Sequence, residues 1–147
     1  KDTCQSLIKK VQLVPIEKQV IVVDDSLVRG TSSRAIVKAL KKAGARKISM
    51  VITYPPIKFP CYAGIDFPSQ EELATYIDEK NYSDKQIVEK VRRDIGVDFL
   101  GYNDPENLAN AVGIPVNSMC FTCVTGNYET LGIKISSFKS RQEMKGE

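Results

Sequence analysis

The feature that most constrains the fold is a short β-branched run that stops at two carboxylates. Val20 to Val23 (VIVV) has the composition of a buried strand. Asp24 and Asp25 follow directly, and next comes a loop with one glycine, Gly30, and several hydroxyl side chains. Apolar residues between 36 and 43 then recur at helical spacing. The order of strand, polar loop and helix predicts an α/β fold.

Further patterns extend this unit along the chain. We expect a helix from about Ser32 or Ser33 to Ala43, with a hydroxyl as its N-cap and Gly44 in the turn that ends it. The segment from Lys47 to Tyr54 (KISMVITY) is predicted to be the next strand, parallel to the first. Capping boxes, prolines and apolar runs predict the remaining elements: helices over 69–77, 83–95 and 104–113, and strands over 97–102 and 132–138. Residues 7–14 and 115–126 have no clear period.

The loop after the first strand is suited to an anion. Free backbone N–H groups and the helix dipole point at the ligand in such a loop, and Gly30 lets the backbone approach it closely. Thr31, Ser32 and Ser33 add hydroxyl donors, and Arg29 adds positive charge. The single glycine excludes both a Walker A loop and a dinucleotide-binding fingerprint. We therefore expect one phosphate here rather than a cradled triphosphate.

Asp24 and Asp25 would repel a phosphate unless they face something positive or a pair of hydroxyls. Ribose 2′- and 3′-hydroxyls can donate to them, and a Mg²⁺-bound ligand suits them as well. The order of acid pair, Gly-hydroxyl loop and helix therefore indicates a ribose followed by its 5-phosphate. The alternative for any Asp-Asp at a strand end is a solvated turn with an Asx cap.

Composition excludes several function classes. The chain has no histidine, so an imidazole base or metal ligand is excluded within its 147 residues. The net charge of +3 is too small, and its Lys and Arg too scattered, to argue for a nucleic-acid partner. No apolar run approaches the roughly 20 residues that span a bilayer. We expect a cytoplasmic protein without a membrane partner.

The cysteines leave several uses open. Disulfides are rare in the cytosol, so Cys4, Cys61, Cys120 and Cys123 call for another explanation. The spacing Cys120-x-x-Cys123 suits a metal chelate or a redox pair. A redox pair should open a helix beside a thioredoxin-like strand. Two partly buried apolar thiols are the remaining alternative.

Beyond these local patterns, the string VIVVDDSLVRGTSSR resembles the signature of type I phosphoribosyltransferases. The form with Ser-Leu-Val-Arg-Gly-Thr looks like the glutamine phosphoribosylpyrophosphate amidotransferases in particular. The likeness continues in order along essentially the whole chain, through PPIKFPCYAGIDFPSQEEL (55–73), IVEKVRRDIGVDFLGY (87–102) and CFTCVTGNY (120–128). It implies a type I phosphoribosyltransferase-like parallel sheet flanked by helices and incomplete at its N-terminal side.

The resemblance also implies roles for individual residues. Asp24 and Asp25 would face the ribose hydroxyls and the Mg²⁺-bound phosphoribosyl pyrophosphate, while Ser26 and the segment Arg29–Ser33 would hold the 5-phosphate. The implied reaction is displacement of pyrophosphate from C1 of the ribose by glutamine-derived ammonia, the first step of purine synthesis. Such a reaction needs positioning and charge stabilisation more than a strong base. No catalytic residue is assigned.

Some members of the family hold a 4Fe–4S cluster through four cysteines. By resemblance Cys61, Cys120 and Cys123 would supply three ligands; Cys4 lies too near the acid pair to be the fourth and is expected to be a bystander. The glutaminase domain and two loops of the transferase core would precede Lys1. We therefore expect a fragment, inactive alone, with a half-core over 1–103 and a helical Cys-x-x-Cys segment over 104–147. The family also suggests a homo-oligomer.

Two alternatives remain open. The chain could be a non-catalytic regulator that binds phosphoribosyl pyrophosphate, although a nucleic-acid-binding element is not evident in the sequence. It could also be another type I phosphoribosyltransferase that uses a base as acceptor, but the C-terminal blocks resemble the amidotransferases instead.

Overall fold

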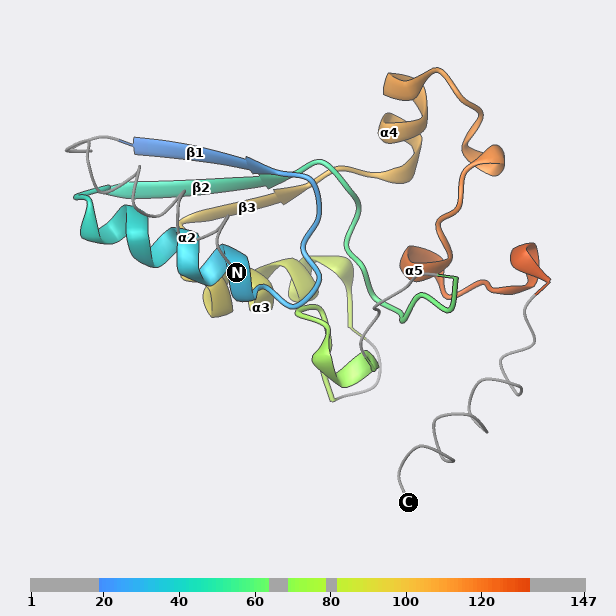
Figure 1. The fold of residues 1–147 in the computed structure, drawn as a ribbon, viewed down its shortest axis with the longest axis horizontal. Helices are drawn as coiled ribbons and strands as arrows, with labels where there is room; N and C mark the ends of the chain where they lie inside the picture. Colours follow the sequence, from blue (N-terminus) through green and yellow to red (C-terminus); the bar gives the residue numbers. More distant parts are fainter. Residues whose placement is uncertain (1–18, 64–68, 79–81, 133–147) are drawn as a thin grey trace.

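The computed structural model describes residues 19–63, 69–78 and 82–132. Within these ranges the strands β1 (Gln19–Asp24), β2 (Lys47–Ile52) and β3 (Phe99–Tyr102) form a parallel sheet in the order β1-β2-β3. The predicted α/β fold with parallel strands is confirmed. All three strands point the same way, so their carboxyl ends meet at one edge of the sheet (Figure 1). The segment 7–14, Cys4 and nearly all of the expected strand 132–138 lie outside the described residues.

Two helices cover one face of this sheet, α2 (Thr31–Lys42) and α3 (Asp84–Ile95) (Figure 1). The main hydrophobic core lies between them and the strands. Met50 and Ile52 from β2 are fully buried there, and Val37 of α2 and Val91 of α3 pack in the same cluster. Burying an aliphatic side chain of this size contributes roughly 1.5–3 kcal/mol, so the contacts on this face stabilise the packing of both helices on the sheet.

The opposite face of the sheet is apolar but open. Ile21 is 71% exposed, Val23 66% and Phe99 53%. The strand register places Ile21 and Phe99 in one row across Ser49, with Val23 beside Val51 in the next. We call Ile21, Val23, Val51 and Phe99 the bare sheet face. Parallel sheets are normally covered on both faces, so this sheet is incomplete as described.

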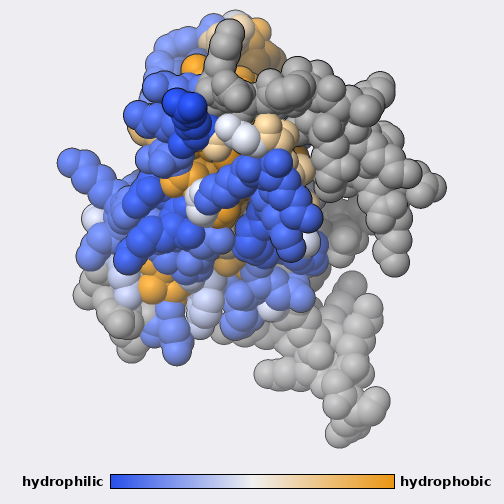
Figure 2. Space-filling model, turned by 90° about the vertical axis from the view of Figure 1, so that its left-hand side faces the viewer, coloured by the Kyte–Doolittle hydropathy of each residue, from blue (hydrophilic) through white to orange (hydrophobic). Residues whose placement is uncertain are grey.

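Figure 2 shows the end of the molecule at which the strands begin, opposite the carboxyl edge. Hydrophilic residues cover most of this end, and only small hydrophobic areas lie between them. Lys41 and Lys42 lie in the last turn of α2, where the negative end of the helix dipole favours cations. No helix among the described residues is both long enough and apolar enough to cross a bilayer.

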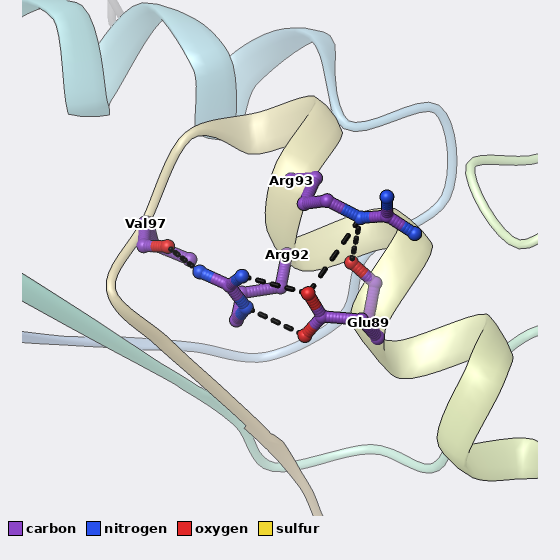
Figure 3. Close-up of polar contacts among 4 residues, drawn as sticks. All are labelled: Glu89, Arg92, Arg93 and Val97. Atoms are coloured by element: carbon purple, nitrogen blue, oxygen red, sulfur yellow. Dashed lines mark hydrogen bonds and ion pairs between the residues drawn. The ribbon is translucent and has the colours of Figure 1, made fainter.

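Local signals place α3 and the helix after β3. The capping box of Ser83 and Gln86 forms at the start of α3 as predicted. At the other end, Arg92 donates to the Val97 carbonyl at 2.9 Å and pairs with both carboxylate oxygens of Glu89, as Figure 3 shows. This contact fastens the end of α3 to the turn that leads into β3. The next helix, α4 (Pro105–Val112), has Asp104 as its N-cap, also as predicted.

The helix predicted over 69–77 is wrong. Only one turn of 3-10 helix, η1 (Gln70–Glu72), forms there, and Leu73 after it is extended. The Ser69 hydroxyl bonds to Glu71 instead of capping a backbone N–H. Thr75, buried beyond the turn, donates its hydroxyl to the Ile57 carbonyl, so tertiary contacts hold this segment out of a helix.

Two predicted strands are shorter than expected. β2 ends at Ile52 rather than Tyr54, and β3 begins at Phe99 rather than Val97. The pairing continues briefly beyond both limits: the Tyr54 N–H donates to the Asp25 carbonyl, and the Asp98 N–H donates to the Ile48 carbonyl. Pro55 then ends the first extension, because proline has no N–H to donate.

The C-terminal part consists of short helices: η2 (Val116–Ser118), α5 (Thr122–Thr125) and η3 (Glu129–Leu131). Of these, α5 contributes Cys123 and Val124 to a second, smaller core cluster that is separate from the main one. Its buried members come from distant parts of the chain: Ile57, Leu73, Phe121, Cys123 and Val124. This cluster brings the Cys-x-x-Cys segment next to the segment that follows β2.

Candidate functional site

The acid pair lies at the carboxyl edge of the sheet. Asp24 is the last residue of β1, and Asp25 is exposed just beyond it. The N–H of Asp25 donates to Asp24 Oδ1 at 3.1 Å, and that of Ser26 donates to Asp25 Oδ1 at 2.9 Å. Burial raises the pKa of the Asp24 carboxyl, and the side chain of Asp25 raises it further. A cation or a pair of hydroxyl donors would relieve this unfavourable arrangement of charge.

The loop after the acid pair is anchored at both ends. Leu27 is 2% exposed in the main core, and the Val28 carbonyl accepts the N–H of Ala74 at 2.7 Å. Gly30 is the N-cap of α2 with φ of 69°, a left-handed conformation, and a Cβ on it would lie 3.2 Å from Arg34 Nη1. The expectation that a hydroxyl caps this helix is therefore wrong. Glycine holds the position because the backbone turns left-handed there.

The first turn of α2 presents the groups that bind anions. The N–H groups of Thr31, Ser32 and Ser33 have no partner within the helix, by the geometry of any helix start. The first turn has no acidic residue that would compete with an anion. Thr31 and Ser32 are exposed, but the Ser33 side chain is 3% exposed on the core side of the helix. We therefore expect Ser33 to contribute its backbone N–H rather than its hydroxyl.

Two arginines flank this turn, and only one of them was singled out from the sequence. Arg29 is directed toward η1, where its guanidinium lies 3.4 Å from the Glu72 carboxylate. Arg34 is the last residue of the signature string VIVVDDSLVRGTSSR. Its guanidinium donates to the Arg29 carbonyl at 3.2 Å and contacts Thr31 Oγ1 at 3.5 Å. Arg34 thus braces the loop and brings positive charge to the start of the helix.

A hollow of about 400 Å³ opens beside the acid pair. Asp25 and Ser26 line one side of it, and mostly apolar side chains line the rest. Sequence patterns gave no sign of these other residues, because the fold brings them together from distant segments: Thr53, Tyr54, Ile57, Leu108 and Cys123. Asp25 and Ser26 of the predicted ribose site and Cys123 of the predicted cysteine site therefore line one hollow.

The three described cysteines are neighbours that differ in exposure. Cys120 is exposed, Cys61 is half-buried and Cys123 is buried. Burial raises the pKa of the Cys123 thiol, and the nearby Cys61 and Cys120 raise it further. Within the described ranges, however, no three His, Cys, Asp or Glu side chains converge closely enough to hold a metal ion. As they lie, the three thiols do not fit a cluster.

The curated relatives that match this chain share one name, amidophosphoribosyltransferase. No family model matches the chain. A curated amidophosphoribosyltransferase of Methanothermobacter thermautotrophicus is 42% identical over 113 residues, which are 77% of this chain and 22% of that protein. The amidophosphoribosyltransferase of Mycobacterium leprae is 41% identical over 76% of the chain and 19% of its own length. A relative from Glycine max, named chloroplastic, is 40% identical over 81% and 20%.

Two solved structures agree with the sequence matches. The glutamine phosphoribosylpyrophosphate amidotransferase of B. subtilis, solved with ADP and GMP, superposes with a TM-score of 0.65 at 37% identity, over 84% of this chain and 28% of that one. An allosteric regulatory enzyme of purine biosynthesis gives 0.66 at 38% identity, over 80% and 24%. The predicted phosphoribosyltransferase-like fold is confirmed. The chain is thus homologous to a part of the amidophosphoribosyltransferases, and it spans only about a fifth of the length of the curated relatives it matches.

Proposed function

We propose that the carboxyl edge of the sheet binds the ribose 5-phosphate group of phosphoribosyl pyrophosphate. The observation that carries the proposal is the order of groups along one short loop. Asp24 and Asp25 can accept hydrogen bonds from the ribose hydroxyls, and the free N–H groups at the start of α2 can donate to the 5-phosphate. Ser26, Arg29 and Gly30 complete the proposed phosphate loop.

The proposed reaction of the complete gene product is the formation of 5-phosphoribosylamine. The nitrogen of ammonia forms a bond to C1 of the ribose, the bond from C1 to the pyrophosphate oxygen breaks, and the nitrogen loses a proton. The residues at the site bind and orient the sugar rather than exchange protons with it. Asp24 and Asp25 fix the ring through its hydroxyls, while Thr31 and Ser32 fix the 5-phosphate. Holding the sugar in this way lowers the barrier mainly through positioning.

A magnesium ion bound with the pyrophosphate is part of the proposal. The fit rests on the donor set: two adjacent carboxylates, of which Asp24 is held partly buried at raised pKa beside Asp25. Carboxylate oxygens are the protein ligands that Mg²⁺ prefers. When bound, the ion would neutralise charge that develops on the departing pyrophosphate. Asp24 and Asp25 are the residues that would face it.

The iron–sulfur cluster implied by resemblance stays a prediction. Cys61 and Cys120 lie near enough to Cys123 to raise the pKa of its thiol, but the three do not form a metal-binding group in the part of the chain that is described. The proposed reaction does not involve the cluster. Iron and labile sulfide analysis of the anaerobically purified gene product tests it: four irons per chain would support it, and a metal-free active enzyme would exclude it.

The wider organisation is proposed from the same resemblance. A glutaminase domain or other preceding part would supply ammonia, and the enzyme would be a cytoplasmic homo-oligomer. Within this chain the proposed domain boundary lies between residues 103 and 104. It separates the half-core (1–103) from the Cys-x-x-Cys segment (104–147). Ile57 and Leu73 join the C-terminal core cluster, so the two parts pack against each other.

The test is a double substitution of the acid pair in the complete gene product. Asp24→Asn with Asp25→Asn should abolish ammonia-dependent use of phosphoribosyl pyrophosphate, because neutral amides cannot replace two carboxylates facing hydroxyls and a cation. The same assay separates an enzyme from a regulator: binding of phosphoribosyl pyrophosphate without turnover by the parent protein would favour the regulator. Unchanged activity in the double variant would remove the acid pair from the mechanism.

A further inference from the structure

Tyr54 lies where the acid pair meets the segment after β2. Its backbone N–H donates to the Asp25 carbonyl at 3.0 Å. The neighbouring Thr53 adds its hydroxyl to the same carbonyl at 3.3 Å and its N–H to the Asp24 carbonyl at 3.0 Å. The backbone of both aspartates is therefore hydrogen-bonded to this short segment, so the position of Thr53 and Tyr54 sets the position of the acid pair.

The side chain of Tyr54 contacts the Cys-x-x-Cys segment. Its hydroxyl lies 3.3 Å from the Cys120 carbonyl and 3.7 Å from Cys123 Sγ. One hydroxyl can donate to the carbonyl while it accepts from the thiol, so both contacts form together. The ring stacks on Phe121, with centroids 6.0 Å apart and planes 29° apart.

The segment that receives Tyr54 is itself firmly held. The carbonyl of Cys123 accepts the N–H groups of both Lys58 and Phe59 at 2.9 Å. Gly126, which ends α5 at φ of 75°, lies so close to the Phe59 ring that a Cβ there would be 3.0 Å from it. The Cys-x-x-Cys segment is thus a fixed point against which Tyr54 can be held.

We propose that Tyr54 is a positioning residue for the ribose site, because it joins the strand end that carries Asp25 to the fixed Cys-x-x-Cys segment. The hollow lined by Asp25, Tyr54 and Cys123 keeps its shape through this link. Without the hydroxyl, the wall of the hollow beside Asp25 moves more freely. The Asp25 carboxylate is then held less firmly in the position that accepts the sugar hydroxyls. The proposal rests on the proposed function, since it assumes that the acid pair binds ribose.

The test is Tyr54→Phe in the complete gene product, assayed for ammonia-dependent use of phosphoribosyl pyrophosphate. Phenylalanine keeps the stacking on Phe121 and removes only the hydroxyl. We expect the KM for phosphoribosyl pyrophosphate to rise roughly two- to tenfold, the change that one hydrogen bond contributes, with kcat nearly unchanged. Ribose 5-phosphate, titrated separately, should bind more weakly by a similar factor. The matched control is Tyr76→Phe, whose hydroxyl donates to Asp78 away from the hollow and whose loss should leave KM unchanged.

Each other outcome overturns something definite. A parent protein that neither binds nor uses phosphoribosyl pyrophosphate overturns the proposed function and this inference together. A parent that uses it, with the same KM in Tyr54→Phe, overturns the positioning role alone. A lower kcat together with a lower thermal unfolding midpoint, without a selective rise in KM, would show that Tyr54 acts on general stability. That result would also overturn the inference.

Discussion

The guanidinium of Arg29 lies 3.4 Å from the carboxylate of Glu72, a residue 43 positions later in the chain. Both side chains are about half-exposed, at 41% and 54%. The sequence predicts Arg29 as a phosphate ligand, yet its charge is shared with a carboxylate of η1. Glu72 would therefore compete with a bound phosphate for this arginine.

Replacement of Glu72 by glutamine should tighten phosphate binding. The KM for phosphoribosyl pyrophosphate in the complete gene product is expected to fall by up to about fivefold, the range for one exposed ion pair. The effect should shrink as salt rises, because exposed charges are screened. Glu71→Gln is the control, since Glu71 bonds to Ser69 instead. A KM that does not change at low salt would place Arg29 beyond reach of the phosphate.

Replacement of Asp24 by asparagine should stabilise the ligand-free chain at neutral pH. Burial raises the pKa of this carboxyl in the folded state, so the folded chain binds its proton more tightly than the unfolded chain does. The charged form is thus a cost of folding above the raised pKa, and the cost disappears as pH falls below the ordinary value of 3.8. Urea denaturation across this range should show a gain for Asp24→Asn at neutral pH that vanishes in acid. A less stable variant at neutral pH would contradict the prediction.

Gly30 should tolerate alanine less well than another left-handed glycine. Any Cβ at φ of 69° costs on the order of 1–2 kcal/mol, and at Gly30 the Cβ would also lie 3.2 Å from Arg34 Nη1. Gly113 has φ of 76°, and a methyl group added there would meet no atom within 4 Å, so Gly113→Ala carries the backbone cost alone. Urea denaturation of both variants should give the larger loss for Gly30→Ala. Equal losses would show that the contact with Arg34 costs nothing.

The buried hydroxyl of Tyr102 has no hydrogen-bond partner within the described ranges. Tyr102→Phe should therefore be neutral or stabilise the chain by about 1 kcal/mol, because it removes a desolvated polar group. The Tyr128 hydroxyl instead donates to the Pro60 carbonyl at 2.6 Å, so Tyr128→Phe should cost about 1 kcal/mol. Thermal or urea unfolding measures both. A clear loss of stability in Tyr102→Phe would reveal a partner for its hydroxyl.

Local signals predicted the parts of the fold that local contacts determine. Ser83 and Gln86 form their capping box because both partners lie within one turn. Asp104 caps α4 in the same way, through a bond to the Asn107 N–H at 2.7 Å. Ser69 offers a similar pattern, but Thr75 is bound to Ile57 nearby in space, and that contact prevails over the helix. Patterns of a few residues cannot show which tertiary contact will compete with them.

The candidate site divides along the same line. The acid pair, the loop and the start of α2 are contiguous in sequence, so one string of residues predicts that they lie together. The hollow beside Asp25 is assembled from residues as distant as Tyr54 and Cys123, 69 positions apart. Neither residue has a local pattern that points to the other. Their meeting depends on the second core cluster, which only the folded chain reveals.

The bare sheet face has a practical consequence for anyone who expresses these 147 residues alone. Ile21, Val23 and Phe99 form an exposed apolar surface. The sheet that carries them has no strand beside the β1 edge among the described residues. Such surfaces adhere to one another as concentration rises. We expect the isolated chain to aggregate during purification. A failure of aggregated protein to bind sugar phosphate would then reflect aggregation and not the chemistry of the loop.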